Sequence, residues 1–151
     1  MAQVAIITAS DSGIGKECAL LLAQQGFDIG ITWHSDVEGA KDTAREVVSH
    51  GVRAEIVQLD LGNLPEGAQA LEKLIQRLGR IDVLVNNAGA MTKAPFLYMA
   101  FDEWRKIFTV DVDGAFLCSQ IAARQMLKQG QGGRIINITS VHEHTPQIGR
   151  A

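Results

Sequence analysis

The chain contains 151 residues, of which 46% are hydrophobic and 21% charged, and its formal net charge is −3 at pH 7. This composition excludes a disordered chain and is typical of a single globular domain, which we place at residues 1–151. Lys and Arg residues are scattered along the chain, so we expect neither nucleic acid nor a membrane among its partners.

The start of the chain and its cysteines favour a cytoplasmic protein. The first residues lack the basic segment of a signal peptide, and no run reaches the roughly 18 apolar residues of a membrane helix. Cys18 and Cys118 lie among apolar neighbours within helical patterns. This placement predicts two free thiols in a reducing compartment.

Short β-rich runs alternate with longer helical patterns along the chain. The runs predict five strands, at Val4–Thr8, Ile29–Trp33, Ala54–Leu59, Ile81–Val85 and Arg134–Thr139. Helical patterns fill the intervals, at residues 14–26, 35–51, 65–79 and 101–129, and the second opens on a Ser35-x-x-Glu38 capping box. The alternation predicts an α/β fold of Rossmann type, a doubly wound parallel sheet in three αβα layers with strand order 3-2-1-4-5.

In this order the fifth strand lies at an edge of the sheet. Ile135, Ile136 and Ile138 nevertheless supply apolar side chains to both of its faces, as in a central strand. An apolar edge invites pairing with another strand. We therefore expect the sheet to be incomplete, with a further segment beyond residue 151 or another chain beside this edge.

A glycine-containing turn, Thr8-Ala-Ser-Asp-Ser-Gly13-Ile-Gly15, follows the first strand and opens the first helix. There, glycines let the backbone approach a pyrophosphate and the helix pack closely on the strand, while the helix N-terminus attracts the anion. A purely structural turn is the alternative. We predict cofactor contacts from Thr8, Ser10, Ser12, Gly13, Ile14 and Gly15.

The spacing of this turn resembles the short-chain dehydrogenase/reductase family, whose pattern is Thr-Gly-x-x-x-Gly-x-Gly. Thr8, Gly13, Ile14 and Gly15 agree with that pattern. Ala9 stands where the family usually has its first glycine. Because Ala resists the positive φ angles that Gly adopts, we expect Ala9 to restrict the turn.

Three further segments match the same family in the same order. Asp60-Leu61 follows the third strand, where the resemblance implies an aspartate that touches the adenine ring. Asn86-Asn87-Ala88-Gly89 closes the fourth strand, and the resemblance places Asn87, Ala88 and Gly89 against the cofactor. Residues 134–140 resemble the fifth strand and end at Ser140, the implied catalytic serine. The resemblance covers residues 4–144 and is strongest to small bacterial reductases of ketones, diketones or oxoacyl groups.

The end of the second strand bears on the choice of cofactor. NAD-specific folds place a carboxylate about 20 residues after the glycine turn, to bind the ribose 2′-hydroxyl. Here that zone holds His34 and Ser35, while Asp36 is expected in the first turn of the next helix. His34 and Ser35 can bond a 2′-phosphate, so we predict NADP, with NAD as the alternative.

The catalytic residues that the resemblance implies are only partly present. The family reduces carbonyls with a Tyr-x-x-x-Lys pair, in which the ammonium lowers the pKa of the phenol. This sequence contains no such pair, since its single tyrosine, Tyr98, is followed four residues later by Asp102. Asp111 stands where the family has a catalytic asparagine, so the implied catalytic residues here are Ser140 and Asp111.

The resulting prediction is an NAD(P)-dependent oxidoreductase that moves hydride between nicotinamide and a small carbonyl or alcohol. The alternative is a truncated, catalytically silent module for nucleotide binding or interaction, because a missing general acid costs about 10²–10⁴-fold in rate. An S-adenosylmethionine-dependent transferase on a similar sheet is a third possibility. The family resemblance also implies a homo-oligomer, formed through the helix after the fourth strand. His142-x-His144 lacks a third ligand at suitable spacing, so we predict no metal.

Overall fold

The computed structural model describes residues 2–145, apart from the side chain of residue 143. Within that range one parallel sheet runs in the order β3-β2-β1-β4-β5, which confirms the predicted strand order. The strands are β1 (Val4–Ile7), β2 (Asp28–Trp33), β3 (Ala54–Gln58), β4 (Val83–Asn86) and β5 (Arg134–Asn137).

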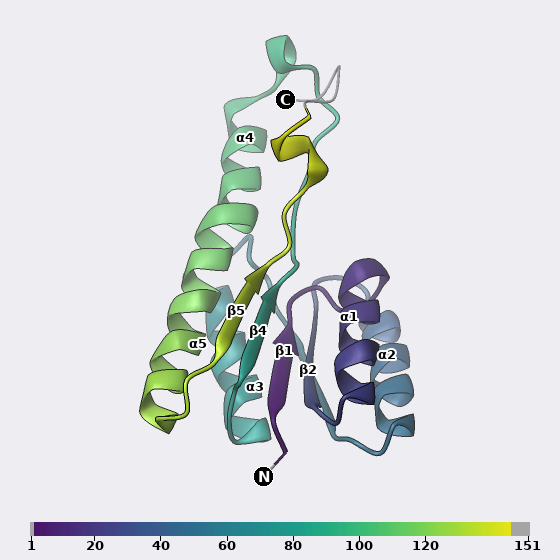
Figure 1. The fold of residues 1–151 in the computed structure, drawn as a ribbon. Helices are drawn as coiled ribbons and strands as arrows, with labels where there is room; N and C mark the ends of the chain where they lie inside the picture. Colours follow the sequence, from purple (N-terminus) through teal and green to yellow (C-terminus); the bar gives the residue numbers. More distant parts are fainter. Residues whose placement is uncertain (1, 146–151) are drawn as a thin grey trace.

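Helices cover both faces of the sheet, so the three predicted layers are present (Figure 1). Helices α1 (Gly13–Gln24) and α2 (Val37–Ser49) pack against Ala5 and Ile7 of β1. Helices α3 (Ala70–Leu78) and α5 (Ala115–Gln129) pack against the alternate residues Val4 and Ile6. Both faces of β1 are therefore apolar because each one meets a helical layer.

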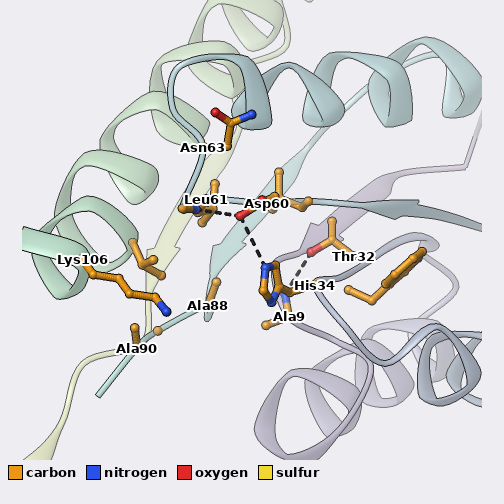
Figure 2. Close-up of a pocket in the computed structure, with 14 residues that line it drawn as sticks. Ala9, Thr32, His34, Asp60, Leu61, Asn63, Ala88, Ala90 and Lys106 are labelled. Carbon is orange, nitrogen blue, oxygen red and sulfur yellow. Dashed lines mark hydrogen bonds and ion pairs between the residues drawn. The ribbon is translucent and has the colours of Figure 1, made fainter. Parts of the chain in front are cut away.

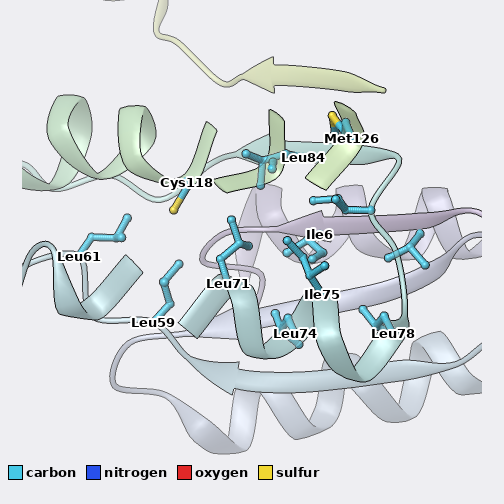
Figure 3. Close-up of a cluster of buried hydrophobic side chains, with 13 residues drawn as sticks. Ile6, Leu59, Leu61, Leu71, Leu74, Ile75, Leu78, Leu84, Cys118 and Met126 are labelled. Carbon is cyan, nitrogen blue, oxygen red and sulfur yellow. The ribbon is translucent and has the colours of Figure 1, made fainter. Parts of the chain in front are cut away.

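Figure 3 shows the core between the sheet and helices α3 and α5. Its side chains come from elements far apart in the sequence, and full burial of each aliphatic one contributes roughly 1.5–3 kcal/mol. The buried members are Val4, Ile6, Leu59, Leu61, Leu71, Leu74, Ile75, Leu78, Ile81, Leu84, Cys118, Ala122 and Met126. This cluster fixes the end of β3 against α5, and so positions residues 59–61.

The start of α2 corrects one prediction. Asp36, not Ser35, is the N-cap, and its Oδ1 accepts a hydrogen bond of 2.9 Å from the backbone N–H of Gly39. A side chain at position 39 would not fit, because a Cβ there would lie 2.5 Å from Asp36 Oδ2. The glycine thus lets the Asp36 carboxylate close over the helix end, and the capping pattern lies one residue later than predicted.

The long helical region predicted at residues 101–129 is interrupted. It consists of α4 (Phe101–Phe108), a π-helical segment η3 (Thr109–Gly114) and α5. The shorter elements η1 (Glu66–Gln69), η2 (Phe96–Tyr98) and η4 (Val141–Glu143) are 3₁₀ turns. Single π-helical turns inside α-helices occur frequently at functional sites.

Strand β5 forms the exposed edge that the sequence predicts. Ile135, Ile136 and Ile138 are 39–45% exposed, although their side chains are aliphatic. Among residues 2–145, no strand lies beyond β5. The strand that we expect to pair with this edge stays a prediction.

None of the helices within residues 2–145 combines the length and the apolar character that a membrane-spanning helix needs.

The two cysteines are free thiols and should react at very different rates. Burial raises the pKa of the Cys118 thiol to about 11. At pH 8 its thiolate fraction should therefore be about 10⁻³, and the neutral thiol is a poor nucleophile. With Ellman's reagent at pH 8, we expect one fast equivalent from half-buried Cys18, and a second only after unfolding in urea. The variant Cys18→Ser should lose the fast phase; two equal fast equivalents in the native chain would contradict the burial of Cys118.

Candidate cofactor-binding site

A cleft of about 510 Å³ lies at the carboxyl edge of the sheet (Figure 2). Its walls come from the segments that follow β1, β2, β3 and β4, and from the α4–η3 region. The lining residues are Ala9, Thr32, Trp33, His34, Leu59, Asp60, Leu61, Gly62, Asn63, Ala88, Gly89, Ala90, Lys106 and Val110. The cleft crosses the point between β1 and β4 where the strand order reverses, which is where open α/β sheets bind ligands.

The glycine turn lies beside this site, and Ala9 is its one residue among those that line the cleft. Ser12 has extended backbone angles as the N-cap of α1, and Gly13 follows with φ +54°. A Cβ on Gly15 would lie 2.2 Å from the carbonyl oxygen of Ala9 and 2.6 Å from Asn87 Nδ2. Gly15 therefore allows the close packing of helix on strand that the sequence predicts, and Gly13 and Ile14 form the first turn of the helix.

Ala9 has a left-handed backbone conformation, which normally favours glycine. Its φ angle is +51°, and it is the non-glycine residue with a positive φ within the described part of the chain. This conformation costs an alanine roughly 1–2 kcal/mol. Two hydrogen bonds hold it, from Ala9 N–H to Thr32 Oγ1 (2.9 Å) and from Asn87 Nδ2 to the Ala9 carbonyl (3.0 Å).

Thr8 and Asn87 join the glycine turn to the end of β4. The Thr8 hydroxyl oxygen accepts from the backbone N–H groups of Asn87 (2.9 Å) and Ala88 (2.8 Å). In return, Asn87 Nδ2 donates to the carbonyl oxygens of Thr8 and Ala9, each at 3.0 Å. We call these four contacts the Thr8–Asn87 clamp.

The hydroxyls of Thr8 and Ser10 form hydrogen bonds within the protein that hold the turn in place, although both residues were predicted as cofactor contacts. Ser10 is fully buried; its hydroxyl donates to the Ile7 carbonyl (2.8 Å) and accepts from Thr32 N–H (3.2 Å). Thr8 is buried as well and occupied by the clamp. We assign both as positioning residues, because neither hydroxyl has exposed surface to offer a ligand.

The end of β3 supplies the acidic wall of the cleft. Asp60 Oδ1 accepts from the backbone N–H of Gly62 at 2.9 Å and lies 3.4 Å from Nε2 of His34 (Figure 2). Leu61 lines the same wall with its buried side chain. His34 and Asp60 are thus brought together, whereas Ser35 is exposed and is not among the residues that line the cleft.

A second cleft, of about 520 Å³, adjoins the first and shares Ala88 and Gly89 with it. Asp111, in the π-helical segment, lines this second cleft, and its Oδ1 accepts from the backbone N–H of Ala90 at 2.6 Å. Asp111 therefore fixes the loop after β4. Together the two clefts follow the sheet edge from β2 to β5.

Ser140 lies past the end of β5 at the edge of this region. Its hydroxyl oxygen caps the η4 turn by accepting from His142 N–H at 3.1 Å. The neighbouring Ile138 and Thr139 line the second cleft, but Ser140 lines neither cleft. The structure thus brings Asp111 to the site, and a catalytic role for Ser140 stays a prediction.

Sequence reasoning missed a polar cluster beneath the second cleft. Asn86 Nδ2 donates to Ser119 Oγ (2.9 Å) and to Asn137 Oδ1 (2.8 Å). Asn86 and Asn137 are register partners on β4 and β5. Both asparagines are the last residues of their strands, and parallel strands end at the same edge of a sheet. That shared position could have predicted their contact.

Lys106 and Asn63 were also missed, although both line the first cleft. Lys106 is four residues before Val110, so the two share one helical face. No group of three or more His, Cys, Asp or Glu side chains converges among the described residues in a way that could hold a metal.

Comparisons with known proteins agree with this geometry. The family model described as short chain dehydrogenase matches residues 3–151. The chain is 97% identical over 146 residues to the protein named Uncharacterized oxidoreductase YohF of Escherichia coli (strain K12), covering 97% of this chain and 58% of that protein. It is 38% identical over 140 residues to a 3-oxoacyl-acyl-carrier-protein reductase of Synechocystis, covering 93% of this chain and 56% of that one.

The fold of the chain also matches that of a solved structure. The acetoin dehydrogenase YohF from Salmonella typhimurium superposes with a TM-score of 0.97 at 74% identity, over 100% of this chain and 60% of that one. The chain thus spans little more than half the length of the relatives it matches.

The clamp gives a direct test of how the site is held. In Thr8→Val the two amides of Asn87 and Ala88 lose their acceptor in a part-buried setting, so the free energy of unfolding should fall by about 2–3 kcal/mol. Thr8→Ser keeps the oxygen and should retain most of the stability. Urea denaturation followed by Trp fluorescence measures both. A larger loss in Thr8→Ser than in Thr8→Val would show that the methyl group, not the hydroxyl, matters.

Proposed function

The chain belongs to the short-chain dehydrogenase family, and from this we propose that it is the cofactor-binding part of an NAD(P)-dependent oxidoreductase. The proposed reaction moves hydride between nicotinamide and a small carbonyl or alcohol. One observation carries the proposal: a cleft at the strand-order switch point, lined by Ala9 of the turn that leads into α1, by Asp60 after β3 and by Ala88 after β4.

The residues present fit a dinucleotide. The first backbone N–H groups of α1 have no partner within the helix, and a Cβ at Gly13 would meet no atom, so the space beside them is open to a diphosphate. Leu61, Ala88 and Val110 offer apolar walls for an adenine ring, and Asp60 offers an acceptor for its amino group. A bound nicotinamide would supply or take the hydride.

We further propose that NADP is the preferred cofactor. Asp36, the nearest carboxylate after β2, is held by Gly39 N–H as the cap of α2. His34 and Ser35 are exposed beside it and can donate hydrogen bonds to a 2′-phosphate. The carboxylate of Asp60 lies 3.4 Å from Nε2 of His34 and can hold the ring in place beside the cleft.

For the substrate we propose a small hydroxyketone or diketone. The relative from Salmonella typhimurium is named an acetoin dehydrogenase, and the second cleft lies where the nicotinamide end of a dinucleotide would reach. Asp111 would hold the Ala90 loop beside that ring, and Ser140 would donate to the carbonyl oxygen. The cytoplasm is the proposed location, in keeping with two free thiols.

Cofactor choice can be tested by calorimetry. The chain should bind NADPH about 10-fold more tightly than NADH, since a charge-assisted hydrogen bond is worth about 1.5–3 kcal/mol. His34→Ala should remove the difference, whereas His50→Ala, at the far end of α2, should not. A preference for NADH in the unchanged chain would overturn the NADP assignment, and no heat with either nucleotide would overturn the proposed function.

Turnover separates the oxidoreductase from a silent binding module. Because this sequence has no Tyr-x-x-x-Lys, acetoin oxidation should run about 10²–10⁴-fold below the rate of the longer E. coli relative, with cofactor binding retained. Equal rates from a homogeneous 151-residue sample would show that another residue supplies the proton. If the E. coli relative itself oxidised no hydroxyketone and reduced no diketone, the substrate class would be wrong.

The apolar stripe on α4, η3 and α5 supports a homo-oligomer. Its members recur at helical spacing and are 38–72% exposed: Phe101, Trp104, Phe108, Val112 and Phe116. Trp104 and Phe108 stack with ring centroids 4.7 Å apart. A helix with such a stripe can pair with its own copy around a twofold axis, so we propose a second copy of the chain as its partner.

Sedimentation of charged variants tests the stripe. Phe108→Glu should convert the oligomer to monomer, because a carboxylate at the centre of an apolar interface lacks a partner. Leu21→Glu places the same charge at an exposed leucine of α1, in the opposite layer, and should leave the oligomer intact. A strictly monomeric unchanged chain, or loss of association in both variants, would contradict the assignment.

A further inference from the structure

Lys106 brings a positive charge to the first cleft that the family pattern and the cofactor assignment leave without a role. It lies on α4 one helical turn before Val110, and both side chains line the cleft. Among the described residues that line it, Lys106 is the single Lys or Arg. In Figure 2 its side chain runs from the helix toward Ala88 and Ala90.

The charges around Lys106 show that it does not serve the protein's own carboxylates there. Asp60 is the one acidic residue among the described lining residues, and its contacts are with Gly62 N–H and His34. The described ion pairs include none to Lys106. The ammonium therefore has hydrogen-bonding capacity for an anionic ligand.

The position of Lys106 along the cleft indicates which anionic group of a ligand it would contact. Ala9 follows β1 and Ala88 follows β4, and both line this cleft on the two sides of the switch point. The Thr8–Asn87 clamp holds these two segments together. A dinucleotide places its diphosphate at this crevice. His34, at the end of β2, lies on the adenosine side instead, where a 2′-phosphate would be.

We propose that Lys106 binds the diphosphate of the cofactor, opposite the backbone N–H groups of the α1 N-terminus. This inference rests on the proposed function and adds a specificity residue to it. The helix amides would hold the diphosphate from the glycine-turn side, and the flexible lysine would close over it from the α4 side. The role is general to phosphorylated adenosine ligands and does not depend on the 2′-phosphate.

The test compares ADP with adenosine, which share the base and ribose and differ in the diphosphate. Lys106→Gln should weaken ADP binding about 3- to 10-fold, as for a partly exposed charge-assisted contact, and leave adenosine binding unchanged. Lys106→Arg should restore most of the ADP affinity. Lys128→Gln is the matched control, because it removes the same charge from the groove between α3 and α5. Calorimetry at two salt concentrations should also show a weaker salt dependence for Lys106→Gln than for the unchanged chain.

Each outcome decides the inference. Loss confined to ADP in Lys106→Gln supports it. If Lys106→Gln weakened the binding of ADP and of adenosine equally, Lys106 would contact the base and the inference would be wrong. If Lys128→Gln weakened ADP binding as much as Lys106→Gln did, the effect would be a non-specific effect of charge, and the inference would again be wrong. Unchanged ADP binding in Lys106→Gln would overturn the inference alone, while absence of ADP binding in the unchanged chain would overturn the proposed function with it.

Discussion

The site depends on the hydrogen bonds between Thr8 and Asn87, which are separated by 79 residues. They join the turn after β1 to the end of β4, across the one crevice where the sheet reverses its strand order. Asn87 donates through its backbone N–H and its Nδ2, and Thr8 accepts through its hydroxyl and its carbonyl, so neither segment can shift without leaving polar groups unpaired. The clamp thus holds two strand ends together as walls of the cleft.

Other features of the site follow from this constraint. With Ala9 held between Thr32 and Asn87, the chain tolerates a left-handed alanine, and α1 approaches so closely that position 15 admits only glycine. Asp111 fixes the next part of the same loop at Ala90, and the π-helical segment offers the local irregularity that brings it there. A rigid, pre-formed cleft reduces the ordering that a nucleotide must impose when it binds.

Local patterns were enough to predict the strand order and the glycine turn, because periodicity and glycine spacing express backbone requirements directly. Ala9 was expected to restrict the turn because alanine resists a positive φ, yet it adopts a φ of +51°. Local patterns could not predict features that depend on contacts between distant segments, or on which of two neighbouring residues caps a helix. Thr8 and Ser10 were predicted as cofactor contacts, yet both are buried and their hydroxyls bind other parts of the chain. Ser35 and Asp36 are both residue types that cap helices well. Asp36 is the cap because Gly39 has no side chain, which leaves room for the Asp36 carboxylate beside the Gly39 N–H. Lys106 carries no local signature, and only the folding of α4 over the cleft shows its place.

The central claim is that the amides at the start of α1 hold a diphosphate in the crevice between β1 and β4. Backbone amide NMR of the isotope-labelled chain during an ADP titration examines it most directly. The account predicts that the largest saturable shifts fall on Gly13, Ile14, Gly15 and Ala88, with smaller ones near Asp60. Saturable shifts confined to residues outside this crevice, or no shifts at millimolar ADP in a folded sample, would contradict it.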